Sequence, residues 1–266
     1  MTEARDIIFE SQLAVEGKRY EHLIDVFKKI NATVNYANYK LTTEERDLFL
    51  AAYKHQIGKL VAAWRTISEW QKTEHTLGEH DLETTKEAMK AKRLEIEQEV
   101  RVMCGEITNV LDQHRFPSSN VEDRILNIKI RADCHHYLAV VCNSEVQKEN
   151  ALGAYSHASE LATINLPPAH PIRLEVHESF ADFYFNVRHL PQLALNLLRA
   201  EVNKAKCIHQ GQLLLSKCKK SKEIIEHLEE SIKHFEETKK NSKRDPFPFS
   251  DLISEDHFNG KTLWLL

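Results

Sequence analysis

The stretch Glu44-Glu45-Arg46-Asp47-Leu48-Phe49-Leu50-Ala51-Ala52-Tyr53-Lys54 decides the fold of this chain. Its apolar residues recur at helical spacing and continue to Ile57 and Trp64, which predicts one long amphipathic helix. Thr42 or Thr43 can cap this helix, and the acidic residues that follow add favourable charge to its first turn. The chain therefore contains at least one long helix with a well-defined start.

The composition extends this prediction to the whole chain. Its 266 residues include only 7 Gly and 7 Pro, the residues that make tight turns and break helices. Sheet proteins need many such turns. Charged residues make up 29% of the chain with both signs mixed, which suits long helices exposed to water. We therefore predict an all-α fold.

Helical spacing of apolar residues recurs along most of the remaining sequence. Further helices are predicted over 20–30, 96–110, 126–142, 151–164, 172–187, 193–206 and 221–239. Between them we expect a polar loop over 75–85, a break and cap over 116–120, a turn over 166–171 and a basic linker over 241–248.

The stretch 44–54, with Ile57-Gly58 and Trp64-Arg65 after it, resembles the third helix of the 14-3-3 proteins. These are dimeric all-helical modules that hold phosphoserine or phosphothreonine peptides. The resemblance extends from Leu13 to Trp264. It implies an antiparallel array of about nine helices with a concave groove, and the helix over 221–239 is expected to be an addition. Stacked tetratricopeptide-like helix pairs are a competing interpretation of residues 147–207.

The resemblance also implies a domain organisation. Residues 1–266 are expected to form a single domain, with a dimerisation half over 1–110 and a groove half over 111–266. An insertion of about 207–248 is expected in the groove half.

The dimer interface implied by the resemblance lies on the first and fourth helices. Gly17 stands where a small residue admits the partner helix, and charged pairs are expected across the dimer. The implied interface residues are Leu13, Gly17, Arg19, His22, Glu95 and Glu99. A homodimer or a heterodimer with a related chain would satisfy this pattern.

The phosphate site implied by the resemblance consists of Lys54, Lys129, His136 and Tyr137. The family has arginines at two positions that hold Val61 and His136 here. Guanidinium groups bind phosphate through paired, charge-assisted hydrogen bonds, which neither replacement can make. Each lost charged hydrogen bond weakens binding by about 1.5–3 kcal/mol. We therefore expect a weakened phosphate site.

The remaining groove residues are matched only in part. Ser179 stands where the family has an asparagine that binds the peptide backbone, while Glu178 and Asp182 replace apolar groove residues. The matched groove residues near the C-terminus are Leu252, Ile253 and Trp264. The predicted function is a signalling adaptor. The alternative is a 14-3-3-derived or tetratricopeptide-like scaffold that binds unphosphorylated peptides, or a groove occupied by the chain's own C-terminal segment.

The sequence gives little indication of a metal site, a catalytic site or a cofactor. Cys134, His135 and His136 are consecutive, so they point about 100° apart on a helix and cannot converge with Cys142 on one zinc ion. No catalytic motif, cofactor motif or metal site is predicted, and the chain is not expected to be an enzyme. Ser242 lies in a basic run, a pattern that is more typical of a linker than of a kinase target.

The net charge and the cysteine content limit which partners and which cellular location are expected. The net charge of −4 does not favour nucleic acid, and no apolar run reaches the length of a membrane helix. The N-terminus is charged and does not resemble a signal peptide. Five cysteines without a disulfide-like pattern favour a reducing compartment, so a cytoplasmic location is expected.

Overall fold

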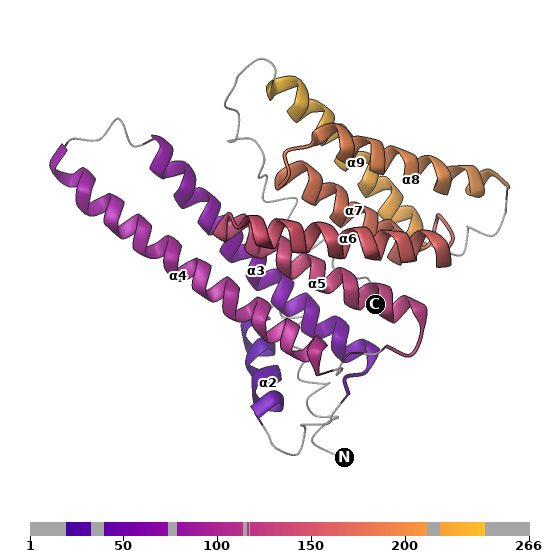
Figure 1. Cartoon of the computed structure of the whole chain (residues 1–266), viewed down its shortest axis with the longest axis horizontal. Coiled ribbons are helices and arrows are strands. Elements are labelled where there is room, and N and C mark those ends of the chain that lie inside the picture. The colour runs from indigo at the N-terminus through magenta and orange to yellow at the C-terminus, as the bar shows by residue number, and fades with distance from the viewer. Residues whose placement is uncertain are drawn as a thin grey trace. The chain divides into compact units, whose positions relative to one another are not determined.

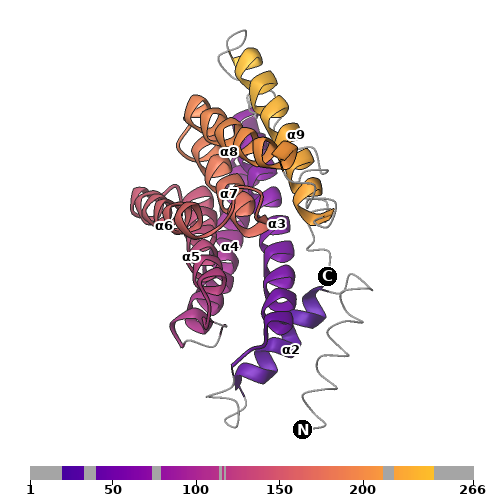
Figure 2. The ribbon, with the colours of Figure 1, turned by 90° about the vertical axis from the view of Figure 1, so that its right-hand side faces the viewer.

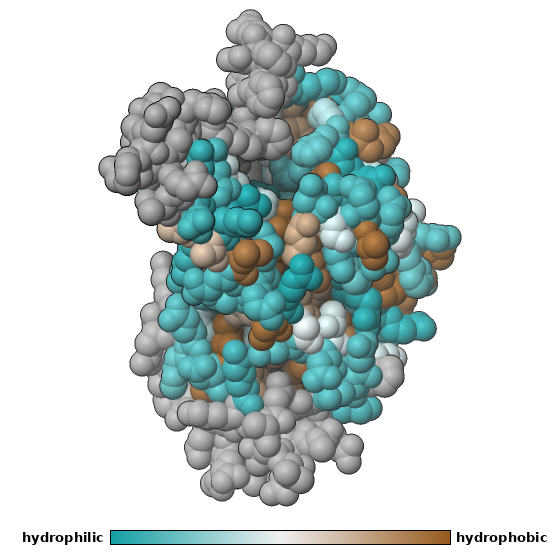
Figure 3. Space-filling view, turned by 60° about the vertical axis from the view of Figure 1, so that its left-hand side comes forward, coloured by the Kyte–Doolittle hydropathy of each residue, from teal (hydrophilic) through white to brown (hydrophobic). Residues whose placement is uncertain are grey.

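The structure is a computed structural model that describes residues 20–32, 40–73, 79–113, 116, 118–211 and 219–242. Every regular element in these residues is a helix, which confirms the predicted all-α fold. None of the described helices combines the length and apolar character needed to span a membrane. The face drawn in Figure 3 is mainly hydrophilic, with hydrophobic residues interspersed among polar ones.

The chain divides into two compact units with a boundary at Pro117 and Ser118. The first unit contains α2 (Tyr20–Ala32), α3 (Thr43–Thr73) and α4 (Glu79–Asp112). Figures 1 and 2 show α3 and α4 side by side along most of their lengths, with α2 against α3.

Aromatic side chains hold the first unit together. Phe49 on α3 lies edge-on to Phe27 of α2, with ring centroids 5.1 Å apart, and stacks on Tyr53 at 4.4 Å. Phe116 contacts the same ring at 5.6 Å. The Tyr53 hydroxyl donates a 2.6 Å hydrogen bond to Glu106 of α4, so the polar end of this buried side chain is satisfied.

The start of α3 has the predicted cap. The Thr42 hydroxyl accepts a 3.2 Å hydrogen bond from the Glu45 backbone N–H, and the Glu45 carboxylate accepts one of 2.8 Å from the Thr42 N–H. This reciprocal arrangement satisfies two donors that the helix itself leaves unpaired. The start of α4 differs from the prediction, because the helix begins at Glu79 inside the stretch 75–85 that was expected to be a loop. A polar composition does not prevent a helix when alternating charges and good helix formers follow.

The second unit contains five helices: α5 (Val121–Cys142), α6 (Glu145–Asn165), α7 (Pro171–Asn186), α8 (Pro191–Gly211) and α9 (Lys219–Ser242). Short connections separate α5 from α6, α6 from α7 and α7 from α8, so these neighbours run antiparallel (Figure 1). Asn120 caps α5 as predicted, because its side chain accepts a 2.7 Å hydrogen bond from the Asp123 N–H.

The helix α9 is part of the core of the second unit. Phe235 stacks on Phe185 of α7 with ring centroids 4.0 Å apart and nearly parallel planes. Ile224 and Leu228 are buried in the same cluster, together with residues of α7 and α8. The amphipathic helix predicted over 221–239 is therefore present, and its apolar face packs against α7 and α8.

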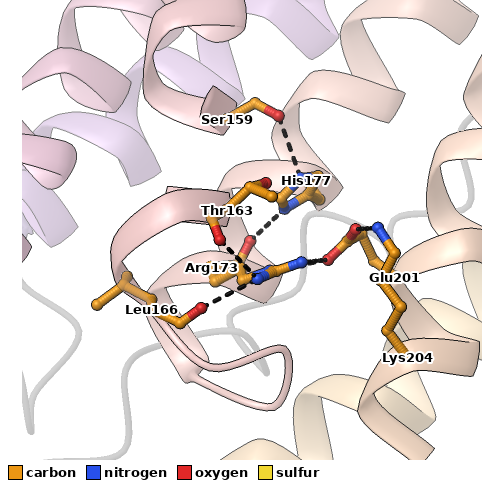
Figure 4. A network of polar contacts seen from close by, with 7 residues as sticks. All are labelled: Ser159, Thr163, Leu166, Arg173, His177, Glu201 and Lys204. Carbon is orange, nitrogen blue, oxygen red and sulfur yellow. Dashed lines mark hydrogen bonds and ion pairs between the residues drawn. The ribbon is translucent and has the colours of Figure 1, made fainter. Parts of the chain in front are cut away.

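A buried polar network joins α6, α7 and α8 (Figure 4). Arg173 donates to Glu201 of α8 and to the backbone carbonyls of Thr163 and Leu166 at 3.2 and 3.0 Å. His177 donates from Nδ1 to the Arg173 carbonyl at 2.7 Å, and its Nε2 lies 3.1 Å from the Ser159 hydroxyl. These bonds fix the start of α7, the helix that carries several candidate groove residues.

Candidate functional site

Two of the predicted site residues share one face of α5 with Asp133. Lys129, Asp133 and His136 are spaced by four and three residues, so all three project from the same side of the helix. Lys129 is buried, and its Nζ lies 2.7 Å from Asp133 Oδ2. Burial alone would lower the pKa of Lys129, but the Asp133 carboxylate, with Glu175 and Glu178 nearby, raises it above the ordinary value. Lys129 therefore stays charged and is already paired with a carboxylate.

Tyr155 of α6 connects this pair to His136. Its hydroxyl donates a 2.6 Å hydrogen bond to Asp133 Oδ1 and lies 3.3 Å from His136 Nδ1. Because the single hydroxyl hydrogen goes to Asp133, the His136 ring donates from Nδ1 to the hydroxyl oxygen. Burial, together with the negative charge of Asp133, raises the pKa of Tyr155 well above its ordinary value. The phenol therefore stays neutral.

The other ring nitrogen of His136 faces α7. His136 Nε2 lies 4.0 Å from Asp182 Oδ2, and Asp182 Oδ1 accepts a 2.6 Å hydrogen bond from the Asn186 side chain. The His136 side chain is 10% exposed, whereas that of Asp182 is 48% exposed. The edge of the ring also packs against Phe183. His136 therefore has one nitrogen committed to α6 and the other directed at a carboxylate that water can reach.

Two further acidic residues of α7 pair with α9. Glu178 Oε1 contacts His227 Nδ1, and Glu175 lies 3.8 Å from Lys220 Nζ. The carboxylates of α7 are thus matched by basic residues on α5 and α9. Glu178 and Asp182 were predicted to replace apolar groove residues, but their partners on α5 and α9 could not be predicted from the sequence.

The structure places the remaining predicted groove residues of the second unit beside this network. Tyr137 follows His136 on α5, is partly buried, and its ring lies 6.0 Å from the His136 ring. Ser179 is partly buried on α7, next to Glu178. Of the phosphate-site residues, the structure therefore brings together Lys129, His136 and Tyr137.

The predicted residues of the first unit lie on α2, α3 and α4. Lys54 is exposed on α3, whereas Val61 on the same helix is 1% exposed. His22 on α2 and Glu99 on α4 are exposed, and Glu95 is paired with Lys92 at 2.9 Å. The other interface residues predicted, Leu13, Gly17 and Arg19, lie outside the described residues, as do the groove residues Leu252, Ile253 and Trp264.

The run Cys134-His135-His136 on α5 is surrounded by protein side chains. Cys134 is buried, and His135 Nδ1 lies 2.7 Å from the side-chain oxygen of Gln147 on α6. Within the described part of the chain, no three histidine, cysteine, aspartate or glutamate side chains are grouped so that they would hold a metal ion.

Comparison with known proteins assigns the family. A family model described as "14-3-3 protein" matches residues 10–236. The chain belongs to the 14-3-3 family. It is 34% identical to 14-3-3 protein epsilon of Drosophila melanogaster over 209 residues, which cover 77% of each chain. It is 35% identical to the 14-3-3-like protein GF14-E of Oryza sativa subsp. japonica over 202 residues, 74% of this chain and 75% of the relative.

Membership of the 14-3-3 family supports a role as a phosphopeptide-binding adaptor. The matched range ends at residue 236, so it includes most of α9. The expectation that α9 is an addition to the family fold, within an insertion over 207–248, stays a prediction. The tail residues Leu252, Ile253 and Trp264 lie beyond the match, and their assignment to the groove stays a prediction, as does the division into halves at residues 110 and 111.

Proposed function

We propose that this 14-3-3 chain is a dimeric adaptor that binds phosphoserine or phosphothreonine peptides of signalling proteins through a weakened phosphate site. The observation that carries this proposal is the state of His136. Its Nδ1 donates to Tyr155, so at most one nitrogen is left for a ligand. A guanidinium group in the same place would offer several donors and a permanent charge.

The other residues of the proposed phosphate site supply little positive charge. Lys129 is held by Asp133 at 2.7 Å, and Val61 supplies no donor. Tyr137 contributes a neutral hydroxyl, and the proposal includes Lys54 of the first unit on the strength of the family resemblance. With so few free charges, phosphate binding is expected to be weaker than a site with two arginines would give, by roughly 10²-fold.

Matched peptides test the proposal. Fluorescence polarisation with a library of serine-containing peptides and their phosphorylated counterparts measures the contribution of the phosphate directly. Phosphorylated peptides are expected to bind in the micromolar range and more tightly than the plain ones. Equal affinity for both forms would refute a phosphate-dependent adaptor.

One observation favours a second candidate, a scaffold for unphosphorylated peptides. On α7, Glu178 is close enough to Lys129 to raise its pKa, and Asp182 lies 4.0 Å from His136. Carboxylates there repel an anionic ligand. In the same binding experiment, this candidate predicts that plain peptides bind and that phosphorylation weakens them.

We propose that the first unit carries the dimer interface. Trp70 on α3 and Leu94 on α4 are each 57% exposed, an unusual position for side chains of this size. A partner chain that covers them would remove this apolar area from water.

Because the family chemistry is peptide binding, we propose no catalytic role, cofactor or nucleic-acid partner, and we place the protein in the cytoplasm.

A further inference from the structure

We propose that the start of α7 is a pH-sensitive latch, which is closed while His170 and His177 are neutral and opens when they take up protons. The latch is the stretch 170–177, which holds about the first two turns of α7 and the residue before them. This device would act whether or not the chain binds phosphate.

The helix itself stabilises its start poorly. His170 occupies the N-cap position, but its side chain makes no capping hydrogen bond. The first turn has no acidic residue to match the positive end of the helix dipole. Arg173 instead places a permanent cation in that turn. Contacts with other helices must therefore hold this start in place.

These contacts reach α5, α6 and α8. Arg173 bonds Glu201 of α8 and two backbone carbonyls near the end of α6 (Figure 4). His177 lies one turn further along the same side of α7 and contacts Ser159 of α6. His170 Nε2 lies 3.6 Å from a carboxylate oxygen of Glu122 on α5. The latch is therefore held through side chains that are cationic or can become so.

The neutral ring of His177 has all its hydrogen bonds. The residue is 2% exposed, and its Nδ1 donates to the Arg173 carbonyl at 2.7 Å. Because a carbonyl only accepts, the proton of the neutral ring is on Nδ1. Nε2 then accepts from the Ser159 hydroxyl, which lies 3.1 Å away. The neutral ring thus ties α7 to α6 without an unpaired polar atom.

A proton on His177 would add a charge that its surroundings do not balance. The groups that face the ring are Ser159 from α6, Arg173 from α7, and Glu201 and Lys204 from α8. Glu201 is the only anion of this set, and it already pairs with both Arg173 and Lys204. Burial therefore lowers the pKa of His177 below its ordinary value.

His170 adds a second group that is more easily accommodated when neutral. Burial lowers its pKa, Glu122 opposes this shift, and Lys220 of α9 adds to it. Its Nδ1 is buried without a hydrogen-bond partner in the described part of the chain. Protonation would also place a positive charge at the N-terminus of α7, where the helix dipole disfavours it. Both histidines therefore favour the closed latch in their neutral form.

Opening should increase as the pH falls below about 6.5. In the open latch a histidine exposed to water has a pKa of about 6.5, whereas in the closed latch the pKa is lower. The open form therefore takes up protons first, and acid shifts the equilibrium towards it. For one histidine, the ratio of open to closed latch rises by up to about ten-fold between pH 7.5 and pH 5.5.

Hydrogen exchange followed by mass spectrometry measures this opening without a ligand. Protection of peptides from 170–180 is compared with that of peptides from 145–155 in α6 at both pH values, after correction for the intrinsic exchange rate. In the wild type, protection over 170–180 should fall at least about three-fold more than over 145–155. His177→Gln should reduce this difference, and adding His170→Gln should bring it below about 1.5-fold. His157→Gln changes an exposed histidine of α6 and should behave like the wild type.

A variant at an exposed position provides a second measurement that needs no buried substitution. The Lys204 side chain is 52% exposed, and its charge opposes protonation of His177. In Lys204→Met, an NMR titration should therefore show His177 taking up its proton at a higher pH than in the wild type. Lys206→Met is the matched control, because Lys206 is similarly exposed on α8, and it should leave the titration unchanged.

Three results would overturn the latch. The first is a wild type in which protection over 170–180 does not respond to pH. The second is an equal loss over 145–155, which would mean that the second unit unfolds as a whole. The third is a double histidine variant that loses as much protection as the wild type. If that variant does not fold at pH 7.5, the Lys204→Met titration decides, and a His177 that titrates as in the wild type overturns the assignment.

These outcomes are independent of the proposed function. Ser179, a predicted groove residue, follows the latch by two positions on α7, so an open latch would weaken peptide binding if the chain binds peptides as proposed. This consequence alone rests on the proposed function. A chain that binds no phosphopeptide at either pH refutes the adaptor, while the exchange measurement still tests the latch.

Discussion

Arg173 on α7 and Glu201 on α8 form a buried ion pair through two nitrogens and one carboxylate oxygen. Arg173 Nε donates to Glu201 Oε2 at 2.9 Å, and Nη2 lies 2.8 Å from the same atom. Both side chains are 5% exposed or less. The Nη1 group of Arg173 donates to two backbone carbonyls near the end of α6, so this one side chain connects three helices.

Breaking this pair from one side should destabilise the second unit strongly. In Glu201→Leu the Arg173 guanidinium keeps its charge in the interior without its carboxylate, at an expected cost of about 3–5 kcal/mol. Urea unfolding followed by circular dichroism measures this change. The double variant Arg173→Met with Glu201→Leu removes both charges and should be more stable than Glu201→Leu alone. If the double variant is the less stable of the two, the bonds of Arg173 to the backbone carbonyls outweigh the cost of its unpaired charge.

Stability should fall between pH 7 and pH 5 because of buried histidines. Burial lowers the pKa of His177 below its ordinary value of 6.5, despite its hydrogen bond to the Arg173 carbonyl. The unfolded chain therefore binds more protons than the folded one below about pH 6.5, and the free energy of unfolding decreases as the pH falls. Burial lowers the pKa of His170 and His189 in the same direction.

The pH dependence can be assigned to His177 by substitution. In His177→Gln the loss of unfolding free energy between pH 7 and pH 5 should be smaller than in the wild type, by up to about 1.4 kcal/mol per pH unit. His157→Gln, at an exposed position on α6, is the matched control and should keep the wild-type slope. Glu201 does not interfere in this range, because its pKa is lowered from 4.5. An unchanged slope in His177→Gln would show that His177 is not the group responsible.

Local features of the fold followed from the sequence more readily than the contacts of the site. The caps at Thr42 and Asn120 were predictable because each bonds a residue only three positions away. The partners of His136 were not, since Tyr155 and Asp182 lie on other helices and their contacts depend on packing angles. Periodicity carries no information about such cross-helix contacts.

One missed contact did leave a signal in the sequence. Glu201 lies three residues after Leu198 and four before Ala205, both of which are buried, so it falls on the apolar stripe of α8. A charged residue at such a position is rarely buried without a partner of opposite charge. The sequence could therefore have predicted a buried pair at Glu201, but not that Arg173 provides it.

Removing the Tyr155 hydroxyl should uncouple His136 from Asp133. In Tyr155→Phe, Asp133 loses a 2.6 Å donor and His136 loses its acceptor, so stability should fall by about 1–3 kcal/mol. Tyr184→Phe is the control, because the Tyr184 ring also stacks on Phe180, at 4.5 Å. Thermal unfolding of both variants gives the comparison. Equal melting temperatures for the two would show that the hydroxyl bridge contributes nothing to stability.

Dimer formation should depend on the exposed apolar residues of the first unit. Light scattering is expected to give about twice the 30.9 kDa chain mass at micromolar concentration. Trp70→Glu places a charge among these residues and should shift the protein towards the monomer. Val146→Glu changes an exposed apolar residue of the second unit in the same way and should leave the mass unchanged. A wild type that scatters as a monomer would contradict the proposed dimer.

Restoring an arginine at position 61 tests whether the weakened site can be repaired. The family resemblance alone predicts that Val61→Arg together with His136→Arg tightens phosphopeptide binding at least about ten-fold, or 1.4 kcal/mol. Val61 is 1% exposed, however, so a guanidinium introduced there would lose its water without gaining a partner. We therefore expect Val61→Arg alone to lower stability by more than about 2 kcal/mol. Thr66→Arg, at an exposed position on the same helix, should change it by less than about 0.5 kcal/mol. Melting temperature and phosphopeptide affinity are measured on the same samples, and a stable Val61→Arg protein with tighter phosphate binding would show that this side chain reaches the ligand.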